Sequence, residues 1–160
     1  MKTRLCAFAA IVCMAAFNLA GVARADTALE VRALYQDFVA AQNAGDLATV
    51  RALLVDQPSF LWVTDGTAVW GPDAAIERMG LFQKSEIWHV DPDLARSRTI
   101  ILGHDAAILH LPLTLAIGAR SPGPDRLRFL VEVVCHRTAA GWRIAALLTT
   151  TEKSGGRAGE

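Results

Sequence analysis

Residues 35–54 read YQDFVAAQNAGDLATVRALL, and this stretch decides the fold. Its pattern predicts a helix that ends at Asn43-Ala44-Gly45 and a second helix that begins after Asp46. Glycine readily adopts the left-handed conformation that ends helices, and an aspartate accepts hydrogen bonds from the free N–H groups at a helix start. Upstream, apolar residues recur every three or four positions, which extends the first, amphipathic helix back to about Leu29.

The residues that follow predict a hairpin, a third helix and then a series of strands. Asp65-Gly66 is a hairpin turn signal, and Gly71-Pro72-Asp73 is typical of a helix start. Four strands are expected after this helix, at residues 87–102 with a bend near 91–93, 106–119, 127–137 and 142–151. Helices followed by strands indicate one α+β domain at 26–153, and the polar tail at 154–160 is expected to be disordered.

Residues 1–25 have the pattern of a cleaved secretory signal peptide. Two basic residues precede an apolar run from Leu5 to Phe17, and Ala23-Arg24-Ala25 is a small-x-small cleavage site. The alternative is a membrane anchor, but this run is shorter than the roughly 20 residues that span a bilayer. We therefore expect a periplasmic or secreted protein that begins at Asp26 and has no membrane association after cleavage.

The charge of the chain argues against a nucleic-acid partner, and its cysteine content argues against a disulfide and a nucleophilic thiol. The chain has 16 basic and 16 acidic residues, and loss of the signal would leave 13 basic residues and a net charge of −3. No basic stripe remains, so nucleic acid is not an expected partner. Cys6 and Cys13 would leave with the signal, so Cys135 would have no intramolecular partner. Its apolar strand favours a buried structural thiol over a nucleophile.

Several segments together resemble the SnoaL-like branch of the NTF2-like superfamily. They are residues 38–46, Leu53-Leu54, residues 71–76 and Gly141-Trp142-Arg143-Ile144. The resemblance covers about residues 27–151. It implies a cone of about three N-terminal helices packed on a strongly curved, mainly antiparallel sheet, with a pocket between the two layers and usually a dimer.

The opening helices also resemble those of ketosteroid isomerases, one enzyme class in this superfamily. Those enzymes use a base together with a tyrosine and a protonated aspartic acid that hold an oxyanion. By position the tyrosine falls on Phe38, the base on or near Trp62, and the acid on or near Val133. All three residues are apolar here, so this resemblance argues against steroid-isomerase chemistry.

The resemblance also implies which strand residues face the pocket. His110 is the candidate acid or base, since a histidine in an apolar strand can exchange protons or bind a ligand. A core or interface histidine is the alternative. The expected pocket residues are Phe38, Trp62, Thr64, Trp88, Thr114, Val133, Cys135 and Arg143, with Thr149 as the alternative to Arg143 on the last strand.

Two polar clusters have simpler explanations than catalysis. His89 and Asp91 share a strand face, but two ligands do not make a zinc site, so no metal or other cofactor is expected. Arg128, Glu132 and His136 form a row on one strand, which is typical of a solvated or subunit-facing side.

The strand at 106–119 is apolar on both faces, and such a sheet needs cover on both sides. Helices can cover one face, and we expect a second subunit to cover the other in a homodimer.

The leading hypothesis is an exported protein that binds a small, mostly apolar molecule. The alternatives are an isomerase, cyclase or hydrolase that uses His110, and a dimeric interaction module without a ligand.

Overall fold

The computed structural model describes residues 26–153, and the predicted signal peptide and tail lie outside this range. The first helix covers residues 26–44 and ends at Gly45, whose φ of 71° is the expected left-handed stop. Asp46 then caps helix α2 (Leu47–Leu53), since its carboxylate accepts a 2.9 Å hydrogen bond from the Thr49 N–H. The predicted break between the two helices is confirmed.

A short hairpin and a third helix complete the N-terminal half. Strands β1 (Leu61–Thr64) and β2 (Thr67–Trp70) pair antiparallel across Asp65-Gly66, and both turn residues have positive φ, as this hairpin turn requires. Helix α3 (Pro72–Phe82) begins after Gly71 with proline in its first turn.

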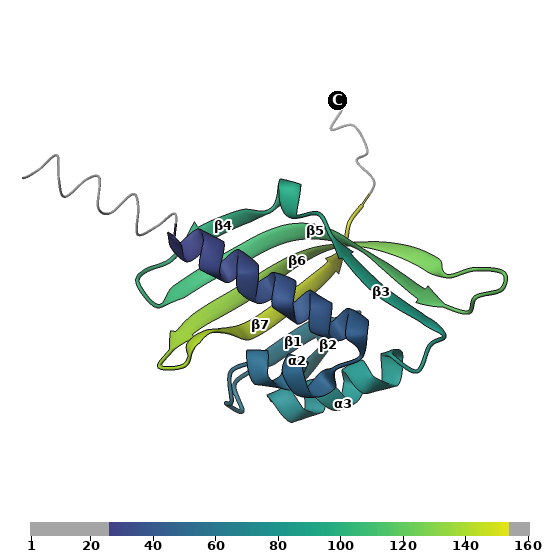
Figure 1. Ribbon diagram of the computed structural model, residues 1–160, viewed down its shortest axis with the longest axis horizontal. Helices are drawn as coiled ribbons and strands as arrows, with labels where there is room; N and C mark the ends of the chain where they lie inside the picture. Colours follow the sequence, from purple (N-terminus) through teal and green to yellow (C-terminus); the bar gives the residue numbers. More distant parts are fainter. Residues whose placement is uncertain (1–25, 154–160) are drawn as a thin grey trace, which may run out of the picture.

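One mixed sheet forms the rest of the molecule. Its further strands are β3 (Ile87–Pro92), β4 (Arg98–Ile101), β5 (Ala106–Gly118), β6 (Asp125–Thr138) and β7 (Gly141–Thr151). The order is β2-β1-β7-β6-β5-β3, and β4 pairs with the other half of β5. Only the β1–β7 pair of this sheet is parallel, and the strands curve around the helices as an α+β cone (Figure 1).

The strand predicted at 87–102 is two strands rather than one bent strand. A short 3₁₀ helix, η1 (Leu94–Arg96), separates β3 from β4. Pro92 has no N–H to continue the ladder, and Asp93 instead caps η1 by accepting a hydrogen bond from the Arg96 N–H. Both strands still pair with β5, so the chain changes direction at η1 while both segments remain in the same sheet.

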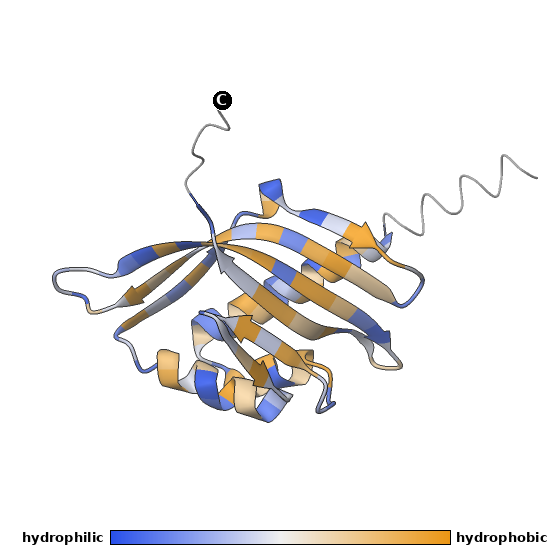
Figure 2. Ribbon diagram, turned by 180° about the vertical axis from the view of Figure 1, so that it is seen from behind, coloured by the Kyte–Doolittle hydropathy of each residue, from blue (hydrophilic) through white to orange (hydrophobic). Residues whose placement is uncertain are grey.

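The two faces of the sheet differ in what covers them. The first helix lies across the face of β5, β6 and β7 that is toward the viewer in Figure 1. Seen from behind, no helix among the described residues lies over the long strands (Figure 2). We call these the inner and outer faces. The core between the first helix and the inner face includes Val31, Phe38, Leu109, Val133 and Ile144, all nearly or fully buried.

No helix within residues 26–153 is long and apolar enough to cross a membrane.

Candidate functional site

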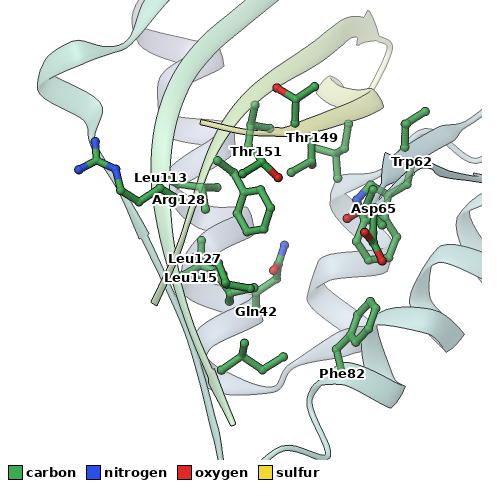
Figure 3. A pocket seen from close by; sticks show the side chains of 18 of the residues that line it. Gln42, Trp62, Asp65, Phe82, Leu113, Leu115, Leu127, Arg128, Thr149 and Thr151 are labelled. Carbon is green, nitrogen blue, oxygen red and sulfur yellow. The ribbon is translucent and has the colours of Figure 1, made fainter. Parts of the chain in front are cut away.

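A cavity of about 960 Å³ opens between the inner face of the sheet, the first helix and α3. Its apolar wall comes from the first helix, α3 and the inner-facing side chains of β3, β5, β6 and β7, while β1 contributes Trp62 and Thr64. Figure 3 shows side chains from both layers converging on one space. The volume lies within the range of small-molecule sites in proteins.

Aromatic rings form one side of this cavity. The rings of Phe82 and Trp88 are stacked, with centroids 6.2 Å apart and planes 6° from parallel. The Trp62 ring meets Phe82 edge-on, and the Arg78 guanidinium lies 5.2 Å from the Phe82 centroid. Such a wall offers broad apolar surface with favourable ring contacts to a flat ligand.

Charged side chains are confined to the rim. Asp65, Arg126 and Arg128 line the opening and are exposed. The Glu152 carboxylate, also at the rim, accepts a 2.8 Å hydrogen bond from Arg128 Nε and forms an ion pair with the same guanidinium at 2.7 Å. The hydrogen bond from Arg128 is the main reason why the pKa of Glu152 lies below its usual range. Glu152 therefore remains an ionised carboxylate and a weak base near neutral pH.

Two polar residues on the first helix reach the cavity interior. Tyr35 and Gln42 line the cavity with only 2% and 8% of their surface exposed. Burial raises the pKa of Tyr35 well above its usual value, so its hydroxyl stays neutral. Neither the Tyr35 hydroxyl nor the Gln42 side-chain amide has a hydrogen-bond partner within residues 26–153.

These two residues were missing from the expected site, although the sequence contained a signal for them. Tyr35, Phe38 and Gln42 are spaced by three and four residues on the apolar stripe of the helix, so all three face the same way. A glutamine on such a stripe is unusual, because burying an unpaired amide costs free energy.

Four expected pocket residues do line the cavity: Phe38, Trp62, Thr64 and Trp88. Val133 and Cys135 are on the same face of β6 but farther along it, where both are 0% exposed within the core. Burial raises the pKa of the Cys135 thiol to about 12, so this cysteine is a neutral, structural side chain.

His110 does not face the cavity, and the expected inward orientation is wrong. Residues directly opposite each other in paired strands share a face of the sheet. Leu109 lies opposite the inward-facing Val133, so the next residue, His110, faces outward together with its partner Glu132. On the outer face, His110 Nδ1 is 2.6 Å from a Glu132 carboxylate oxygen. Thr114 is on this outer face too, opposite Arg128. Acid–base chemistry by His110 inside the cavity is therefore not supported.

Arg143 is also directed away from the cavity, because β7 contains a bulge. Val134 pairs with Ala146 and Cys135 pairs with Ile144, so Ala145 is the extra residue. The bulge reverses the alternation of faces between Arg143 and Thr149. Thr149, the alternative to Arg143, therefore lines the cavity, while Arg143 shares the outer face with His136.

The remaining polar clusters lie outside the cavity interior. His89 and Asp91 are exposed on the outer side of the edge strand β3. Glu132 and His136 are on the outer face, and only Arg128 of that row reaches the cavity rim. In the described part of the chain, no group of three or more His, Cys, Asp or Glu side chains is placed to hold a metal ion.

Comparisons with solved structures agree on this fold. A candidate dehydratase of the NTF2-like family from Streptomyces avermitilis is 18% identical with a TM-score of 0.70, covering 81% of this chain and 99% of that one. An NTF2-like superfamily protein from Salmonella enterica is 16% identical with a TM-score of 0.69, covering 82% and 96%. A candidate scytalone dehydratase from Novosphingobium aromaticivorans is 12% identical with a TM-score of 0.70, covering 83% and 89%.

A search of curated proteins found no significant match. The sequence profile of the SnoaL-like domain matches residues 31–147, which include most of the first helix, α3 and most of the sheet. With this match and the NTF2-like architecture of its structural neighbours, the chain belongs to the SnoaL-like domain family.

Proposed function

We propose that this protein is exported and binds a small, mostly apolar molecule in its cone-shaped cavity. The observation that carries the proposal is the arrangement of the cavity itself, with aromatic and aliphatic walls inside and charged groups at the rim. Burial of apolar ligand surface contributes about 25 cal/mol per Å², so a hydrophobic body can bind there without a charged anchor.

The proposal is tested by thermal-shift and calorimetric screening of steroid-, terpenoid- and polyketide-like molecules. A binder should lose its affinity in Leu115→Trp, which places an indole in the cavity. The matched control is Thr114→Trp on the neighbouring residue of β5, whose side chain is on the outer face. Absence of binding by the whole panel, or equal binding by both variants, contradicts the proposal.

The export part of the proposal rests on residues 1–25 and needs its own test. Cell fractionation should place the protein outside the cytoplasm, and mass spectrometry should show a mature chain that begins at Asp26. An uncleaved chain in the cytoplasm would refute export without affecting ligand binding.

A homodimer through the outer face is also part of the proposal. The centre of this face carries apolar side chains that are only partly buried, and Ile100 is 51% exposed. A second copy of the sheet would remove this surface from water. The apolar outer-face residues concerned are Ile100, Ile108, Leu130, Val134 and Leu148.

A further inference from the structure

The Gln42 side chain and the Trp88 indole N–H are polar groups of the cavity lining without a hydrogen-bond partner in the described part of the chain, and of these two only Gln42 offers both a donor and an acceptor. Only two polar or charged residues in the described part of the chain are classed as buried, Gln42 and Ser97. The Ser97 hydroxyl donates a 2.8 Å hydrogen bond to the Leu94 carbonyl oxygen. The Gln42 amide has no protein partner within residues 26–153, and Figure 3 shows it directed into the cavity.

The helix end that carries Gln42 is held in place by its neighbours. The Gln83 side chain at the end of α3 donates a 3.0 Å hydrogen bond to the Gln42 backbone carbonyl oxygen. The adjacent Asn43 uses its amide for two hydrogen bonds with the backbone of Val90 in β3. The two neighbouring carboxamides therefore have different roles, since Asn43 joins the helix to the sheet, whereas the Gln42 amide has no partner in the described part of the chain and extends from a backbone that is held in place. A polar side chain without a protein partner, on a backbone that is held in place, is suited to contact a ligand.

The surroundings of Gln42 define the class of group it can bind. A carboxamide presents an N–H donor and a C=O acceptor side by side, so its best partner presents the complementary pair. The nearby cavity wall is apolar, and the second polar residue, Tyr35, remains neutral because burial raises its pKa. Arg126 and Arg128 are exposed at the rim, so a buried anionic group would lack a cation beside it.

We propose that Gln42 selects ligands whose inner end carries a neutral donor–acceptor group, such as a carboxamide or a lactam. This inference rests on the proposed cavity binding and adds to it the chemistry of the recognised group. Gln42 positions the ligand by two adjacent hydrogen bonds, and the aromatic wall packs against the apolar body.

The test uses three probes that share a naphthalene body. Naphthalene-2-carboxamide carries the donor–acceptor pair, 2-isopropenylnaphthalene is its apolar counterpart, and 2-naphthoate is its charged counterpart. Dissociation constants are measured by fluorescence titration for the natural protein and for Gln42→Met, which has nearly the same shape without the amide. Gln36→Met is the matched control, since Gln36 is exposed on the same helix. Gln42→Leu serves as a second variant if Gln42→Met does not fold.

The expected result concerns the ratio of the carboxamide and isopropenyl Kd values. In Gln42→Met, loss of the two hydrogen bonds should raise the carboxamide Kd relative to the isopropenyl Kd by roughly tenfold. In Gln36→Met this ratio should be unchanged. The natural protein should also bind the carboxamide more tightly than the naphthoate.

Two other outcomes separate the two proposals. Binding of both neutral probes with a ratio that Gln42→Met leaves within twofold would overturn the role of Gln42 and retain the cavity as a ligand site. A failure of all three probes and of the wider ligand panel to bind the natural protein would overturn the proposed function, and the role of Gln42 with it.

Discussion

The Asn43 side-chain amide donates a 2.9 Å hydrogen bond to the Val90 carbonyl oxygen and accepts one of 2.8 Å from the Val90 N–H. The two residues are 47 positions apart, and Val90 lies on β3 at the edge of the sheet. The pair satisfies a backbone donor and acceptor that the edge of the sheet would otherwise leave unpaired, and it fixes the end of the first helix beside the cavity.

Asn43→Ala should therefore destabilise the protein. It removes both hydrogen bonds and leaves the partly buried backbone groups of Val90 without a partner, which costs about 1–3 kcal/mol. The free energy of unfolding in urea measures the effect. Gln36→Ala on the exposed face of the same helix is the control and should change this free energy by less than about 0.5 kcal/mol. Equal values for the two variants would show that the Asn43–Val90 pair contributes nothing.

Glu30 should make the stability depend on acidic pH. The hydrogen bond from Trp142 Nε1, aided by Arg137, lowers the pKa of Glu30 from its ordinary value of 4.5. Because the folded pKa is lower than the unfolded one, this contribution is fully present above the ordinary value and is lost as pH falls through the lowered pKa. In Glu30→Gln, unfolding measured between pH 7 and pH 2.5 should show lower stability at pH 7 and a weaker loss toward acid. Glu77→Gln, at an exposed position on α3, is the control, and an identical acid profile for both variants would refute the prediction.

Val134→Lys should convert a dimer into a monomer. Val134 lies near the centre of the outer face, opposite Ile108 on β5 and Ala146 on β7. A lysine there would put charge into the proposed apolar interface, where it has no partner. Sedimentation equilibrium measures the molecular mass of each variant. Leu81→Lys introduces the same charge at an apolar position on α3 that is 57% exposed, and it should leave the dimer intact. A natural protein that sediments as a monomer contradicts the predicted interface.

Cys135 should resist alkylation in the folded protein. The side chain is 0% exposed, and burial raises the pKa of its thiol to about 12, so neither access nor a thiolate is available. A chain of residues 26–160, in which Cys135 is the one cysteine, is treated with iodoacetamide at pH 8 and its mass is measured. One adduct should form in guanidinium chloride and none in native buffer within the same time. Similar labelling rates in the two solutions would contradict the buried position.

Local sequence patterns were sufficient for most of the elements. Gly45 and Asp46 ended one helix and started the next through backbone conformation and a local hydrogen bond, and Asp65-Gly66 set its hairpin in the same way. These features depend on residues within a few positions of each other. The break between β3 and β4 was predicted only as a bend, although the hydrogen bond by which Asp93 caps η1 is local as well.

The sequence by itself thus determined the α+β architecture and its resemblance to the SnoaL-like family, which the domain match confirms. Tertiary structure decided which side chains of β5 and β7 face the cavity. Both faces of β5 are apolar, so alternation could not place His110, and only the pairing with β6 puts it on the outer face beside Glu132. Likewise, the sequence left Arg143 and Thr149 as alternatives, and the bulge at Ala145 decided for Thr149, because one extra residue reverses the facing of every residue beyond it.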